Sequence, residues 1–157
     1  MTNRQRIIHV QLDEKTMVRR RPEVEHERAI AIYDLLEENH FAPVGEYHGP
    51  YHLHLRLADN RLVFDVRTQE DERLLEVPLP LKPFQSIVKD YFLICESYYS
   101  AIKKSSPSQI EAIDMGRRGL HNEGSELLKE RLMGRIDVDF DTARRLFTLI
   151  CVLHIRG

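Results

Sequence analysis

Three consecutive runs of alternating apolar residues constrain the fold of this chain more than any other feature of its sequence. They cover residues 51–57, 61–67 and 74–79, and every second side chain in each run is apolar, as in a half-buried β-strand. Asp59 and Asn60, between the first two runs, suit a two-residue hairpin turn. The runs therefore predict an antiparallel three-stranded meander with one apolar face and one solvent-facing side.

The hairpin turn also fixes the register of the first two strands. Apolar residues then oppose apolar residues, in the pairs Leu53–Val66, Leu55–Phe64 and Leu57–Leu62. A slip of one residue would turn half of these side chains to the wrong face. We expect one buried face made of Leu53, Leu55, Phe64, Val66, Leu75 and Val77.

The segments around the meander supply a further strand and a first set of helices. Residues 7–12 alternate like another strand, whereas apolar residues recur at helical spacing at roughly 22–39 and again over 84–102. Prolines and glycines predict a loop over residues 41–50. The aromatic stripe of the second helix is typical of a core-facing side rather than of a cofactor site.

The C-terminal part of the chain is predominantly helical in pattern. Ser106, Pro107 and Gln109 together predict a helix start with a capping box. Residues 136–138 suit a short strand, and the apolar segment after residue 140 suits a buried helix, with a terminal strand as the competing interpretation. We predict a single domain over residues 1–157 with an α+β fold. In it, a small antiparallel sheet, made of the meander and the N-terminal strand, packs against a C-terminal helical half.

Composition excludes several classes of protein. The chain has 157 residues with 23 basic and 25 acidic side chains, and a net charge of −2, which argues against a general nucleic-acid or membrane-surface binder. No signal peptide is evident, and the longest apolar run is too short to cross a bilayer. We expect a cytoplasmic protein in which Cys95 and Cys151 are buried free thiols.

Residues 110–133 are the strongest candidate for a functional site. The segment has helical periodicity, but it contains Gly116, Gly119 and Gly124, and each glycine in a helix interior costs about 1 kcal/mol relative to alanine. Such glycines indicate either close approach of another backbone or side chain, or a break in the helix. Polar residues are concentrated around them: Asp114, Arg117, Arg118, His121, Asn122 and Glu123.

This composition suits recognition of an anion. Two adjacent arginines can hold a phosphate or carboxylate through paired hydrogen bonds, and His121 or Glu123 can carry a proton. If the helix instead broke at residues 122–124 and restarted at Ser125, free backbone N–H groups would again favour an anion. A purely structural alternative remains open, in which Asp114 and Glu123 satisfy the arginines in an internal salt-bridge network.

The polar face of the meander offers a second, weaker site. The register aligns His54, Asp65 and Glu76 across three strands, with His52 nearby, and histidine and carboxylate side chains can bind zinc. Ordinary cross-strand charge pairs are the competing interpretation. Because no ligand set has the spacing of a closed zinc site, we expect no structural metal. We also expect no cofactor.

Five segments of the chain resemble a known family. They are residues 87–99 (IVKDYFLICESYY), 110–128 (IEAIDMGRRGLHNEGSELL), 140–157 (FDTARRLFTLICVLHIRG), 22–29 (PEVEHERA) and 49–55 (GPYHLHL). Together they closely resemble an uncharacterised family of small bacterial proteins, over essentially the whole chain. The resemblance implies a single-domain bacterial protein of the cytosol, and it supplies no activity and no catalytic residue.

We interpret the chain as a cytoplasmic interaction or regulatory module with an arginine–histidine anion-binding pocket. Its partner is expected to be a protein or a small anionic ligand, and formation of a homo-oligomer remains open. An alternative is a hydrolase or phosphate-handling enzyme that uses His121 and Glu123 beside Arg117 and Arg118. A partner protein with a purely structural role is the third interpretation.

Overall fold

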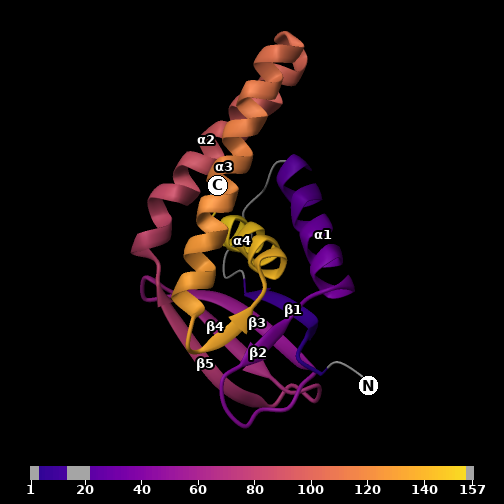
Figure 1. The fold of residues 1–157 in the computed structure, drawn as a ribbon, viewed down its shortest axis with the longest axis vertical. Coiled ribbons are helices and arrows are strands. Elements are labelled where there is room, and N and C mark those ends of the chain that lie inside the picture. The colour runs from indigo at the N-terminus through magenta and orange to yellow at the C-terminus, as the bar shows by residue number, and fades with distance from the viewer. Residues whose placement is uncertain (1–3, 14–21, 155–157) are drawn as a thin grey trace.

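The computed structural model describes residues 4–13 and 22–154, and these residues form an α+β fold (Figure 1). The strands are β1 (Ile7–Asp13), β2 (Phe41–Pro43), β3 (Tyr51–Ala58), β4 (Arg61–Arg67), β5 (Arg73–Pro80) and β6 (Ile136–Val138). The helices are α1 (Pro22–Glu37), α2 (Lys82–Lys104), α3 (Pro107–Leu132) and α4 (Phe140–His154). The predicted fold class is confirmed.

The meander has the predicted register. In β3 and β4, Leu53 pairs with Val66, Leu55 with Phe64 and Leu57 with Leu62, while Asp65 of β4 pairs with Glu76 of β5. Asp59 and Asn60 have φ angles of 52° and 61°, the left-handed values that a tight hairpin turn of this type requires. On the predicted apolar face Leu75 is partly buried, and the other members are buried.

The remaining strands pair in ways that alternation alone did not specify. β1 lies parallel to β3, so the four-stranded sheet is mixed, in the order β1-β3-β4-β5. β2 pairs antiparallel with β6 to form a separate two-stranded sheet. The prediction of a loop throughout residues 41–50 is therefore wrong for residues 41–43, because their pairing partner lies far away in the sequence.

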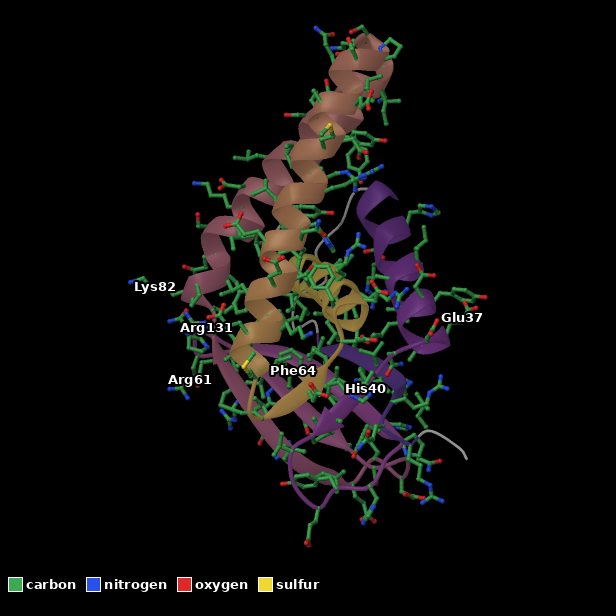
Figure 2. The ribbon with its side chains drawn as sticks, viewed as in Figure 1. Glu37, His40, Arg61, Phe64, Lys82 and Arg131 are labelled. Atoms are coloured by element: carbon green, nitrogen blue, oxygen red, sulfur yellow. The ribbon has the colours of Figure 1, made fainter. Side chains whose placement is uncertain are left out.

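Helices cover one face of the main sheet, and the core lies between these two layers (Figure 1). Phe64 is fully buried there, whereas Arg61, Lys82 and Arg131 extend at the outside (Figure 2). The C-terminal apolar segment is the helix α4, with Leu146, Phe147 and other side chains completely buried. Since α4 packs against both α3 and α1, it is the centre of the helical layer.

Helix α3 is continuous through all three glycines. Ser106 and Gln109 form the predicted capping box, and the alternative of a break at residues 122–124 is wrong. At Gly124 an added Cβ would overlap the ring of Phe147 on α4, so this glycine permits close helix packing. Helices α2 and α3 form an antiparallel hairpin that projects well beyond the sheet (Figure 1).

Cys95 and Cys151 are buried and unbridged, as predicted. Among the described residues, no helix has the length and apolar character needed to cross a membrane.

Candidate functional site

A pocket of about 630 Å³ lies beside the middle of α3. It is lined by residues of α1 (Ile30, Ala31, Asp34), α2 (Tyr91), α3 (Arg117, Arg118, His121, Asn122) and α4 (Asp141, Arg144, Arg145, Thr148). The structure thus brings together four of the six side chains named from the sequence. Asp114 is bonded to two of them, whereas Glu123 is exposed and does not line the pocket.

Asp114 orients both arginines of α3. One carboxylate oxygen accepts hydrogen bonds from Nε and Nη2 of Arg117, at 3.1 and 2.7 Å, and the other lies 2.9 Å from Nη2 of Arg118. Hydrogen bonding from Arg117 is the largest effect on the Asp114 carboxyl, and its pKa is held below the usual value. The spacings of three and four residues place all three side chains on one helix face. The salt-bridge network proposed from the sequence therefore exists at Asp114 and does not include Glu123.

Arg117 is held more firmly than Arg118. Its guanidinium carbon lies 5.0 Å from the centroid of the Tyr98 ring, and it also donates a hydrogen bond to Tyr91. Burial opposes the charge, but the bond to Asp114 and the interaction with Tyr91 outweigh this and raise the pKa of Arg117. The side chain of Arg118 is 69% exposed, so it can adjust to whatever enters the pocket.

His121 is a neutral imidazole in the pocket wall. Its Nε2 lies 2.7 Å from Oγ1 of Thr148, and that hydroxyl donates at 3.2 Å to the carbonyl of Arg144. The Thr148 hydroxyl thus links the imidazole of His121 to the backbone of α4. Burial, together with the positive charges of Arg144 and Arg117, lowers the pKa of His121 to about 4. With Glu123 outside the pocket, the predicted proton-transfer pair of His121 and Glu123 is not assembled.

Two lining arginines were missed by the sequence reasoning. Arg144 and Arg145 come from α4, where the described part of the chain gives Arg144 no ion pair and Arg145 a hydrogen bond of 3.2 Å to the carbonyl of Glu38. A signal was available, because this arginine doublet interrupts an otherwise apolar helix and repeats the doublet of α3. The pocket thus contains four arginines and two aspartates, an excess of positive charge.

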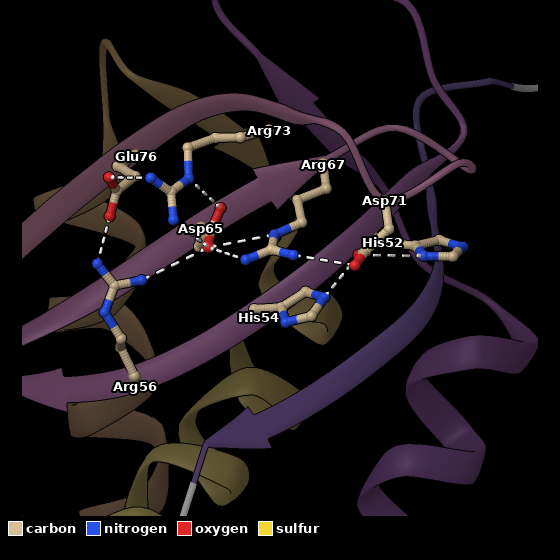
Figure 3. A network of polar contacts seen from close by, with 8 residues as sticks. All are labelled: His52, His54, Arg56, Asp65, Arg67, Asp71, Arg73 and Glu76. Atoms are coloured by element: carbon tan, nitrogen blue, oxygen red, sulfur yellow. Dashed lines mark hydrogen bonds and ion pairs between the residues drawn. The ribbon is translucent and has the colours of Figure 1, made fainter.

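The second site from the sequence, on the polar face of the sheet, is a network of ion pairs (Figure 3). Asp65 is only 1% exposed and accepts hydrogen bonds from Arg56, Arg67 and Arg73. Burial alone would raise the pKa of Asp65, but the bonds from Arg67 and Arg73 lower it overall. At the centre of this face, which was expected to be solvent-facing, arginine side chains therefore shield Asp65.

The histidines of this face have a different partner from the expected one. Nε2 of His54 lies 2.9 Å from a carboxylate oxygen of Asp71, a residue of the turn after β4, and His52 lies 3.9 Å from the same oxygen (Figure 3). Glu76 forms ion pairs with Arg56 and Arg73. Asp65 and Glu76 are thus occupied by arginines, and no group of three or more histidine, cysteine or acidic side chains among the described residues could hold a metal ion.

Comparison with known proteins defines the family. The model of the uncharacterised protein family UPF0262 matches residues 4–156. The chain belongs to UPF0262. It is 73% identical to the UPF0262 protein of Paramagnetospirillum magneticum, with both chains covered completely. It is 68% identical to the UPF0262 protein of Rhodospirillum rubrum, over 96% of this chain and 93% of that protein.

These relatives place the chain in a bacterial family and match it over most or all of its length. A third UPF0262 protein, from Rhizobium leguminosarum bv. trifolii, is 62% identical over 97% of this chain and 96% of its own length. No solved structure matches the chain. For this UPF0262 chain, the pocket geometry is therefore the basis for the functional proposal.

Proposed function

We propose that this protein is an interaction or regulatory module that recognises a small anionic ligand in the pocket between α1, α3 and α4. One observation carries the proposal: four arginines from two helices line a single pocket, and one of them, Arg144, forms no ion pair among the described residues. A guanidinium without a carboxylate partner is the group that an anionic ligand would satisfy.

The neighbouring groups support this assignment. Asp114 and the Tyr98 ring hold Arg117 in a fixed direction, so little freedom of that side chain is lost when a ligand binds. His121 stays neutral at physiological pH and contributes an uncharged polar side chain to the pocket wall. Asn122 and Thr148 add uncharged polar groups to the same wall.

Thermal denaturation in the presence of anions tests the proposal. We expect phosphate, sulfate or a common nucleotide to raise the melting temperature of the wild-type protein, because a ligand at 100 times its Kd stabilises the folded state by about 2.7 kcal/mol. Arg144→Ala should fold normally and lose most of this gain. Arg144 is preferred to Arg117 for this test, since removal of Arg117 would also break its bond to Asp114.

Arg131→Ala is the matched control, because Arg131 is an exposed arginine on α3 that does not line the pocket. It should retain the full gain from the anion. Native mass spectrometry of the same samples would show the bound anion and the oligomeric state together. The proposal is wrong if none of these anions stabilises the wild type, or if Arg144→Ala responds as strongly as Arg131→Ala.

A further inference from the structure

Two carboxylates in the same pocket are not used by anion recognition. Asp34 lies on α1 and Asp141 on α4, and neither side chain forms an ion pair or hydrogen bond with the rest of the described chain. Asp141 precedes Arg144 by three residues and Arg145 by four, spacings that commonly support ion pairs on a helix. Arg145 instead donates to the backbone of Glu38. Acceptors for a ligand are therefore available beside the arginines.

Building on the proposed function, we infer that the ligand of this pocket is a hydroxyl-bearing phosphate ester, of the kind found in sugar phosphates and nucleotides. The phosphate lies against Arg144 and the arginine pair of α3. The hydroxyl groups donate hydrogen bonds to Asp34 and Asp141 and accept from Asn122. A hydroxyl group can do both at once, which suits a wall that carries both donors and acceptors.

Charge and size favour this class over the alternatives. An ammonium group near Asp141 would also lie near Arg144 and Arg145, which are one helical turn away, and would be repelled by them. A neutral hydroxyl group meets no such repulsion. A pocket of about 630 Å³ is also far larger than inorganic phosphate requires and falls in the range of small-molecule sites. Ile30 and Ala31 supply an apolar wall for the carbon skeleton.

Titration calorimetry with three probes tests the inference: inorganic phosphate, ribose 5-phosphate and O-phosphoethanolamine. We expect wild-type protein to bind ribose 5-phosphate at least tenfold more tightly than phosphate, and O-phosphoethanolamine no more tightly than phosphate. Asp34→Asn and Asp141→Asn should each lose most of the ribose 5-phosphate advantage. Both should bind inorganic phosphate at least as well as wild type, because a negative charge beside the arginines has been removed.

Asp90→Asn is the control, since Asp90 is exposed on α2 and lies outside the pocket. It should keep the wild-type order of affinities. If phosphate binds but ribose 5-phosphate has no advantage, or keeps its advantage in both pocket variants, the inference is wrong and the proposed anion site stands. A preference for O-phosphoethanolamine would also overturn it. If no probe binds, the inference is wrong, and the proposed function is wrong with it when no anion raises the melting temperature either.

Discussion

At the scale of single residues, Gly124 and Gly119 make opposite predictions although both lie inside α3. An added Cβ at Gly124 would overlap the Phe147 ring, whereas at Gly119 it would meet nothing within 4 Å. We expect Gly124→Ala to destabilise the protein by roughly 1–3 kcal/mol through overpacking. Gly119→Ala should stabilise it by about 0.5–1 kcal/mol, because alanine loses less backbone entropy in a helix. Urea unfolding of the two variants would measure the difference, and equal effects would contradict the packing described for Phe147.

The site residues also show how far single-residue chemistry can be predicted. Arg117, Arg118 and His121 were identified because they cluster within one segment of the sequence. Arg144 and Asp34 were not, because each becomes part of the site only when α4 and α1 pack beside α3. Glu123 lies outside the pocket for a different reason. Its neighbours in sequence line the pocket, but its direction from the helix takes it into solvent.

At the scale of elements, the central carboxylate of the sheet face should matter more than its neighbour. Asp65 is buried beneath three arginines, while Glu76 is 33% exposed at the side of the network. We expect Asp65→Asn to cost about 2–4 kcal/mol, near the range for a broken buried ion pair. Glu76→Gln should cost less than about 1 kcal/mol, as for exposed pairs. Urea unfolding at pH 7 would measure the loss in free energy of unfolding for both variants. A similar loss for both would show that the burial of Asp65 does not make its ion pairs more stabilising than those of Glu76.

Elements whose pattern is local were predictable, and elements that depend on a distant partner were not. The meander follows from alternation and from a turn of two residues, and the capping box of α3 follows from four consecutive residues. The pairing of β2 with β6 joins segments that lie about 95 residues apart in the sequence. Residues 41–43 alone show no strand pattern, so this pairing could not be predicted. The parallel direction of β1 likewise depends on how α1 and the following segment return the chain to β3.

At the scale of the whole molecule, the pocket exists because α4 holds α1 and α3 apart on either side of itself. The arginine doublets of α3 and α4 would each be exposed to solvent on an isolated helix. They line one pocket only because the helices pack together. The environment of His121 depends on this packing. Its ring centroid lies 5.3 Å from that of Phe147 on α4 and 5.4 Å from that of Tyr91 on α2. Its protonation is therefore coupled to global unfolding.

We expect the stability of the protein to fall as pH decreases from 6.5 towards 4. The pKa of His121 is about 4 in the folded protein and 6.5 as its ordinary value, so the unfolded state binds more protons within this window. Between pH 6.5 and 5 the loss attributable to His121 is about 1.5 kcal/mol, or roughly 3–6 °C in melting temperature. His52 acts in the same direction, because burial and the nearby His9 lower its pKa.

Melting curves from pH 7.5 to 5 in buffers without phosphate would measure this dependence. His121→Gln should remove the part of the pH dependence of the melting temperature that His121 causes. The part caused by His52 should remain. His26→Gln is the control, since His26 is exposed on α1 outside the pocket, and its curve should run parallel to that of the wild type. If His121→Gln also runs parallel to the wild type, His121 is not held neutral by burial and by the arginines. The electrostatic description of the pocket, and with it the excess positive charge expected to attract an anion, would then need revision.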